Sequence, residues 1–243
     1  MTELPRSLVE ASTLTTRWHS LLAAAPEADP HPVLVLPGFS TGDEMTLVLR
    51  RFITRLGYKS LPWLQGINTG NPRQIEAIMR RFYRLHHSLG CRISIVGHSM
   101  GGVYAREIAR TFPDAVRCVI TLGSPYNAEA GSSNPLVEEL FERMSGVSVE
   151  ELRRRLPKAR EERRLPVPAT SVFTKADGVV AWRTCIEPES RRSENIRVIG
   201  SHAGLGVNAD VLRVVADRLA QNPRAWKKFD KTSGCRKLAY PSD

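Results

Sequence analysis

The residues best suited to covalent chemistry in this 243-residue chain are Gly97-His98-Ser99-Met100-Gly101, which fit the pattern G-x-S-x-G. Because glycine has no Cβ, the chain can reverse sharply on either side of Ser99 and leave its hydroxyl exposed at the tip of a turn. Met100 opens a predicted helix, so its N–H and the positive end of the helix dipole face the place where negative charge would collect. A serine nucleophile needs this arrangement.

The elements on either side must hold that turn in place. A β-branched run, Ile93 to Val96, predicts a strand before it, and apolar residues at helical spacing follow it until Pro113. A short G-x-S-x-G string also occurs by chance in loops, where the serine merely fills space. The strand and the helix around this one favour the chemical interpretation.

Strand and helix patterns alternate along the rest of the chain. Apolar or β-branched segments predict strands at 33–36, 58–62, 117–122, 169–174 and 196–199. Apolar residues at helical spacing predict helices at 7–25, 43–56 and 208–220, and Asn71-Pro72 opens another. The alternation predicts an α/β fold, with a mostly parallel sheet of about six strands and helices on both faces.

Five short motifs follow one another between Pro32 and Trp226. They are Leu36-Pro37-Gly38-Phe39, Gly97-His98-Ser99-Met100-Gly101-Gly102, Thr121-Leu122-Gly123-Ser124-Pro125, Asp177-Gly178-Val179-Val180 and Gly200-Ser201-His202. Their order resembles the α/β-hydrolase superfamily and its lipase and esterase branch, with a similarity to class 2 lipases and inositol-deacylase-like hydrolases. The resemblance implies a trimmed α/β-hydrolase fold, without the first two strands, that hydrolyses a carboxylic ester.

In that superfamily the nucleophile is followed along the chain by the acid and then by the base. Of the six histidines, only His202 lies in a loop directly after the last predicted strand, among glycines that let its ring reach the serine. It is the predicted general base. Asp177 follows the preceding strand and is the predicted acid, which orients the imidazole and stabilises the imidazolium. An aspartate before a glycine is also common in turns, so Asp210 and Glu187 are the alternative acids.

Two backbone N–H groups are expected to bind the oxyanion. Met100 supplies one, and Phe39 supplies the other, where Gly38 allows a close approach. The residues predicted to line the acyl or alcohol pocket are Gly38, Phe39, Tyr126, Trp182 and Leu205. The side chains of Phe39, Tyr126, Trp182 and Leu205 also each fit a place in the core.

The predicted reaction proceeds through an acyl-enzyme on Ser99, which water activated by His202 then hydrolyses. No metal or organic cofactor is needed, and the sequence has no H-E-x-x-H, C-x-x-C or P-loop pattern. Two alternatives stay open. One is an acyltransferase of the same fold, and the other is a non-catalytic ligand-binding member of the superfamily.

The length suits a single domain over 1–243, with an N-terminal helical extension over 1–30. Residues 127–168 interrupt the alternation with one helix from Asn134-Pro135 to Gly146 and another from Ser148 to Pro157. The resemblance implies that this insertion is a lid, and a helical hairpin that only stabilises the fold is the alternative. The basic tail, 228–243, is expected to fray, starting at Lys227.

Charge and composition limit the expected partners. Lysine and arginine total 35 against 25 acidic residues, and they concentrate in 153–164, 191–192 and 227–237. No groove-reading motif or stacking aromatic residues accompany them, so a solvated basic surface is favoured over nucleic-acid binding. Peripheral contact with an anionic membrane through the basic lid is the alternative. The expected ligand is a small-molecule or lipid ester, with no obligate protein partner.

The same features bear on location. No apolar run is long enough to span a bilayer, and the first residues lack the pattern of a secretory signal. The four cysteines are widely spaced, which favours free thiols. A cytoplasmic enzyme is therefore expected.

Overall fold

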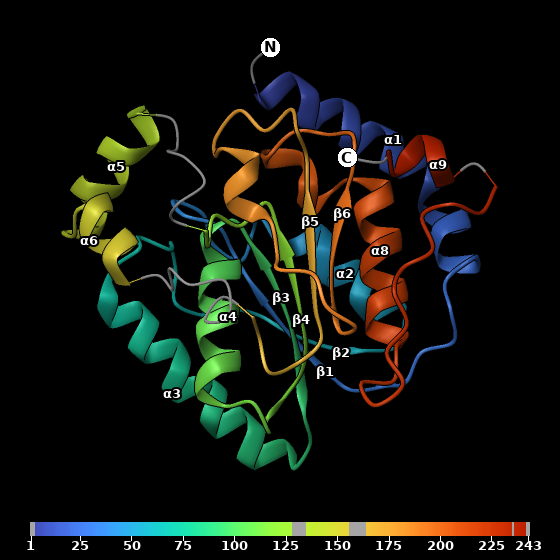
Figure 1. Ribbon diagram of the computed structural model, residues 1–243, viewed down its shortest axis with the longest axis horizontal. Helices are drawn as coiled ribbons and strands as arrows, with labels where there is room; N and C mark the ends of the chain where they lie inside the picture. Colours follow the sequence, from blue (N-terminus) through green and yellow to red (C-terminus); the bar gives the residue numbers. More distant parts are fainter. Residues whose placement is uncertain (1–2, 128–134, 156–163, 235, 242–243) are drawn as a thin grey trace.

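The computed structural model describes residues 3–127, 135–155, 164–234 and 236–241. Its described strands form one parallel sheet in the order β2-β1-β3-β4-β5-β6 (Figure 1). The strands are β1 (Pro32–Leu36), β2 (Lys59–Leu61), β3 (Ile93–His98), β4 (Val116–Leu122), β5 (Ala169–Phe173) and β6 (Ser193–Arg197). The predicted six-stranded parallel sheet is thus confirmed.

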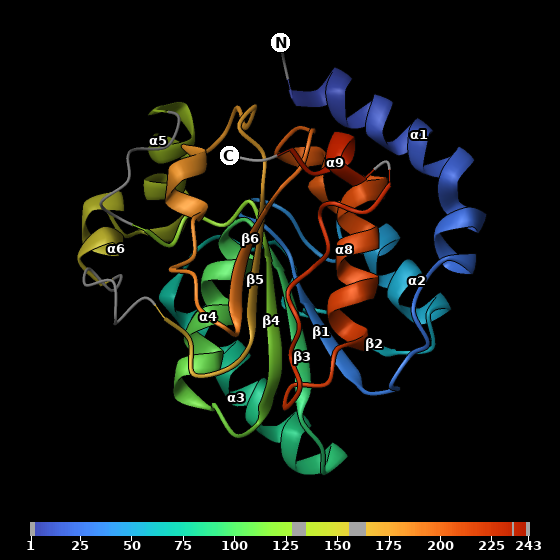
Figure 2. The same cartoon turned by 45° about the vertical axis from the view of Figure 1, so that its right-hand side comes forward.

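Helices cover both faces of the sheet (Figures 1 and 2). One face carries α1 (Glu3–Ala23), α2 (Leu47–Arg55) and α8 (Ala209–Ala220), and the other carries α3 (Pro72–Leu89) and α4 (Met100–Thr111). Successive strand residues point to opposite faces, so Val33 and Val35 pack with the first group of helices while Leu34 and Leu36 pack with the second. Covered on both sides, these strands are continuous apolar runs in the sequence.

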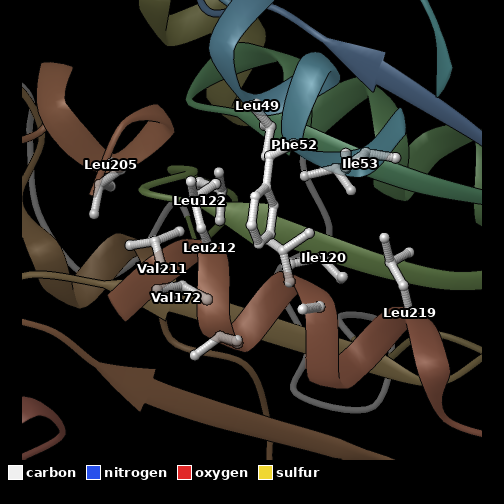
Figure 3. Close-up of a cluster of buried hydrophobic side chains, with 14 of the residues drawn as sticks. Leu49, Phe52, Ile53, Ile120, Leu122, Val172, Leu205, Val211, Leu212 and Leu219 are labelled. Carbon is white, nitrogen blue, oxygen red and sulfur yellow. The ribbon is translucent and has the colours of Figure 1, made fainter. Parts of the chain in front are cut away.

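The core on the first face is built from aliphatic side chains around one aromatic ring (Figure 3). Phe52 of α2 lies between Leu212 of α8 and Ile120 of β4, all fully buried. Leu205, which comes from the 3-10 helix η3 (Ala203–Gly206), belongs to the same cluster. This packing anchors the segment that directly follows His202.

The carboxyl ends of the strands meet at one edge of the sheet. Leu36 is in register with Gly97 and Gly97 with Thr121, while Phe173 at the end of β5 is in register with Arg197 at the end of β6. The loops that follow these strands therefore leave the sheet side by side. Ligands of open parallel sheets bind at this edge.

The insertion after β4 contains the two predicted helices, α5 (Pro135–Ser145) and α6 (Val149–Arg155). Ser148 caps α6 by accepting a hydrogen bond from the Glu151 N–H at 3.0 Å, as its sequence predicted. The predicted end of this helix at Pro157 lies outside the described residues, as do the basic residues Lys158, Arg160 and Arg163 of the lid. Arg154 is exposed and faces Glu150 at 3.5 Å.

The expected fraying of the tail is wrong for its described part. Phe229 and Tyr240 are buried and pack against one another edge to face. Tyr240 directly follows α9 (Arg236–Ala239). The Phe229 N–H donates to Glu194 at 2.8 Å, and the Tyr240 hydroxyl donates to the Asp210 carbonyl at 3.0 Å. Two aromatic side chains thus give a basic segment enough apolar area to pack.

Among the described helices, none is long and apolar enough to cross a membrane.

Candidate active site

Ser99 lies at the turn between β3 and α4, in a backbone conformation that is rare for a residue with a side chain. Its φ is +50° and its ψ is −123°, and its N–H donates to the Leu122 carbonyl at 2.8 Å. A Cβ on Gly101 would collide with the carbonyl oxygens of Leu36 and Pro37, so only glycine fits at this position. The strained turn is held by the backbone on either side of it.

Asp177 and His202 are joined by a hydrogen bond. The loop after β5 carries Asp177 and the loop after β6 carries His202, whose Nδ1–H donates to Asp177 Oδ2 at 2.7 Å. The other oxygen, Oδ1, accepts from the N–H groups of Val179 at 2.9 Å and Val180 at 2.8 Å. Both side chains are almost fully buried. A carboxylate only accepts, so this bond fixes the proton on Nδ1 and leaves Nε2 with a lone pair.

Ser99 and His202 line the same pocket, at the carboxyl edge of the sheet. Glycines bring the surrounding backbone close to both: a Cβ on Gly38 would lie 3.2 Å from Ser99 Cβ, and one on Gly123 would lie 3.1 Å from His202 Nδ1. The hydrogen bonds of the described residues do not include one from Ser99 Oγ to His202. Catalytic hydrogen bonds without substrate are often long and shorten in the complex.

His98, the neighbour of Ser99, packs beside the turn and supports His202. The two imidazole centroids are 5.1 Å apart, and His98 Nε2–H donates to the His202 carbonyl at 2.9 Å. Burial lowers the pKa of His98 to about 4, with a further contribution from His202. A neutral His98 beside the His202 ring adds no positive charge there at neutral pH.

The two N–H groups expected in an oxyanion hole have no backbone acceptor among the described residues. The backbone hydrogen bonds between described residues employ neither the Phe39 nor the Met100 N–H. The fully buried Asn68 fixes the loop that carries Phe39. Its side-chain Nδ2 donates to the Pro37 carbonyl at 3.0 Å, and its backbone carbonyl accepts from the Ser40 N–H at 2.7 Å. Sequence reasoning missed Asn68, since nothing in a loop of mixed composition marks one amide as buried.

The pocket has a volume of about 310 Å³ and mostly apolar walls. Gly38 and Phe39 line it, as predicted. The insertion supplies a wall that the sequence did not identify: Val137, Leu140 and Phe141 of α5 and Val149 of α6. Phe141 meets Phe39 edge to face, with ring centroids 5.4 Å apart.

Three predicted lining residues are outside the pocket. Tyr126 is buried with its hydroxyl bonded to the Cys185 carbonyl at 2.7 Å, beneath the Arg106 guanidinium. Trp182, in the 3-10 helix η2 (Trp182–Cys185), stacks on Phe173. Leu205 points into the core, as Figure 3 shows. Each side chain is thus engaged with residues outside the pocket lining.

The two alternative acids are engaged elsewhere. Glu187 forms a fully buried ion pair with Arg106. Asp210 accepts from Arg17 of α1 at 2.8 Å, on the face covered by α1 and α8. Neither lines the pocket, and Asp177 is the acid bonded to His202.

Comparison with solved structures shows the same fold in several enzymes. Lipase B of Aspergillus fumigatus superposes with a TM-score of 0.64 at 16% identity, over 90% of this chain and 60% of that one. A monoacylglycerol lipase of Paleococcus ferrophilus gives 0.57 at 16% identity, over 78% and 93% of the two chains. The carboxylesterase CesB of Bacillus subtilis gives 0.52 at 13% identity, over 85% and 97%. This chain therefore spans less than two thirds of the length of the Aspergillus lipase.

No curated protein sequence matches the chain. A family model does: the PGAP1-like alpha/beta domain matches residues 73–204, which is more than half of the chain. The matched segment runs from the start of α3 through Ser99 and Asp177 to just beyond His202. The chain therefore belongs to the PGAP1-like alpha/beta domain family and has the α/β-hydrolase fold, as the order of its motifs predicted.

Proposed function

We propose that the protein is a serine carboxylic-ester hydrolase of the esterase or lipase type that works through an acyl-enzyme on Ser99. The observation that carries the proposal is the Asp177–His202 hydrogen bond at 2.7 Å beside the pocket that Ser99 lines. Asp177 is the acid and His202 the base. A positioned base and a third group that orients it are what a serine hydroxyl needs to attack at neutral pH.

In this mechanism Ser99 Oγ attacks the ester carbonyl while His202 Nε2 takes its proton. The oxyanion that forms accepts hydrogen bonds from the Phe39 and Met100 N–H groups, and Asp177 stabilises the imidazolium. His202 gives the proton to the leaving alcohol. It then takes a proton from water, which attacks the acyl carbonyl, and gives that proton to Ser99 Oγ as the acyl–oxygen bond breaks and the carboxylic acid leaves.

The walls of the pocket favour an aliphatic acyl group. One wall consists of α5 and α6 side chains, among them Leu140 and Phe141, and the Phe141 ring contacts Phe39. Burial of each methylene against such walls contributes about 0.8 kcal/mol. We expect kcat/KM to rise with acyl length until the roughly 310 Å³ of space is filled. The similarity in fold to a monoacylglycerol lipase supports a lipid ester as substrate.

The test is a panel of p-nitrophenyl esters of increasing acyl length, assayed with the wild type and Ser99→Ala. The variant should lose at least about 10³-fold in kcat and should no longer react with a fluorophosphonate. Ser94→Ala, at the other end of the same strand and away from the pocket, is the matched control and should keep both activities. A Ser99→Ala protein that still hydrolyses the panel would refute the proposed nucleophile.

A further inference from the structure

The first turns of α1 lie over the two loops that carry the acid and the base. These are the acid loop, residues 174–181 after β5, and the base loop, residues 198–203 after β6, which includes the first residue of η3. In both views the amino-terminal part of α1 lies beside these loops (Figures 1 and 2). Helix α1 also contacts η3, which follows His202 directly.

Two side chains of α1 each contact both loops. Glu3 Oε1 accepts from the Gly178 N–H of the acid loop at 2.8 Å. Glu3 Oε2 accepts from the Ala203 N–H, directly after His202, at 3.0 Å. Arg6 donates from one nitrogen to the Ala176 carbonyl at 2.7 Å and from the other to the Gly200 carbonyl. The two residues are three apart in the helix and so point to the same side.

The loops leave room for these side chains. A Cβ on Gly178 would lie 2.7 Å from Glu3 Oε1. Glu10, one turn further along the same face of α1, accepts from the Ser201 N–H at 2.6 Å and the Ser201 hydroxyl at 2.8 Å. A Cβ on Gly200 would lie 2.6 Å from Glu10 Oε1. Glycines in both loops therefore occur where α1 carboxylates approach the backbone.

The sheet itself does not set the positions of these loops. Its hydrogen bonds between β5 and β6 end with the Val198 N–H donating to the Phe173 carbonyl at 2.9 Å. Beyond it, Thr174 Oγ1 donates to the Gly200 carbonyl at 2.9 Å, and Asp177 accepts from His202. Backbone groups of both loops bond to α1 side chains instead: the N–H groups of Gly178, Ser201 and Ala203 and the carbonyls of Ala176 and Gly200.

We propose that Glu3 and Arg6 are positioning residues, which hold the acid and base loops at the separation that aligns Asp177 with His202. This inference rests on the proposed hydrolase function and adds a requirement for α1. Neither residue lines the pocket. A misplacement of about 1 Å in a catalytic group can cost about 10²-fold in rate, so loss of a contact that spans both loops should appear in kcat.

Glu3→Gln tests the bridge by changing one atom. A carboxylate has two accepting oxygens, whereas a glutamine side chain accepts through one oxygen and presents its NH₂ group to the other backbone N–H. One loop must therefore lose its partner. Arg6→Lys is the second variant, because an ammonium on one stem keeps the charge but lacks the fork that reaches both carbonyls. Arg17→Gln is the matched control: Arg17 joins the same helix to Asp210 and touches neither loop.

The measurements are kcat and KM on the best p-nitrophenyl ester, the rate of fluorophosphonate labelling, and the melting temperature. We expect Glu3→Gln to lower kcat and labelling together by about 10- to 100-fold, with KM changed less than twofold and a melting temperature close to that of Arg17→Gln. Arg6→Lys should show the same pattern, and Arg17→Gln should keep wild-type kcat.

The outcomes separate this inference from the proposed function. If Glu3→Gln and Arg6→Lys keep the kcat of Arg17→Gln while Ser99→Ala is inactive, the positioning role is refuted and the hydrolase proposal stands. If Ser99→Ala retains activity, the hydrolase proposal fails first. If Glu3→Gln does not fold, Arg6→Lys decides. A slower labelling rate in Arg6→Lys that is accompanied by a lower melting temperature than that of Arg17→Gln would show a purely structural contact and refute the positioning role.

Discussion

Asparagine in place of Asp177 should remove most of the activity while leaving the fold intact, and the structure explains why. Asp177 Oδ1 accepts from two backbone N–H groups, those of Val179 and Val180, and Oδ2 accepts from His202 Nδ1–H. The asparagine oxygen must take the place of Oδ1 to keep the two backbone bonds. Its NH₂ group then faces His202, which can only respond by accepting on Nδ1 and carrying its proton on Nε2. That tautomer cannot take the Ser99 proton.

The magnitude follows from the cost of the opposite orientation. Turning the amide so that its oxygen faces His202 would break both backbone bonds, each worth about 1 kcal/mol, and would leave buried donors unpaired at about 1–3 kcal/mol. A total of about 4 kcal/mol corresponds to about one productive molecule in 10³. Loss of the charge that stabilises the imidazolium adds to this, so we expect kcat to fall by about 10³- to 10⁴-fold.

The assay is ester hydrolysis under saturating substrate, with fluorophosphonate labelling as a substrate-independent measure of Ser99 reactivity. Asp210→Asn is the matched control, because it makes the same change in the alternative acid, which pairs with Arg17 instead. It should keep activity within about twofold. A folded Asp177→Asn enzyme within tenfold of the wild-type kcat would show that Asp177 does not orient the base.

Three further predictions concern the turn, the pocket and acid stability. Gly101→Ala should lower the free energy of unfolding by about 3 kcal/mol or more in urea titrations, because the new Cβ meets backbone carbonyls that have no room to move. Leu140 lies in the partly exposed pocket wall. Leu140→Ala should raise KM several-fold for esters with long acyl chains and leave KM for acetate esters unchanged. Burial lowers the pKa of His31 to about 4, so the native state binds fewer protons than the unfolded chain and stability falls as the pH drops from about 6.5 to 4. After allowance for partial exposure, His31→Gln should recover about 2 kcal/mol of that loss, which urea midpoints measured across this pH range will show.

Periodicity and motif order were sufficient to predict most of the fold. Buried parallel strands are continuous apolar runs, so β1 and β3 were visible in the sequence, and asparagine with proline marked the start of α3. The prediction that the basic tail frays was wrong because it gave more weight to charge than to two aromatic residues, Phe229 and Tyr240, which are buried. An average over a segment conceals single side chains that decide whether it packs.

The pocket was predicted less well than the residues around the serine. The turn and the His202 loop are fixed by glycines and by strand ends, which the sequence displays. Whether an aromatic residue near such a loop faces the pocket or the core depends on small rotations of the backbone, and periodicity does not resolve them. Tyr126 and Trp182 therefore could not be assigned. The apolar wall from α5 was missed because the sequence predicted that helix without showing which of its sides faces the pocket.

The contacts of α1 show a further limit of prediction from the sequence. They also explain why the site needs an element so distant in the sequence. Glu3 reads as an ordinary first-turn carboxylate, which stabilises a helix wherever it lies, so nothing local distinguishes it. Its partners, Gly178 and Ala203, are 175 and 200 residues away. Loops beyond the ends of strands must satisfy their backbone groups with other side chains, and the two that carry Asp177 and His202 do so partly through α1. The geometry of the proposed triad thus depends on the first turns of a helix whose core contacts, Leu14 and Leu21, come later in its sequence. For that reason activity should be more sensitive than stability to changes at those first turns.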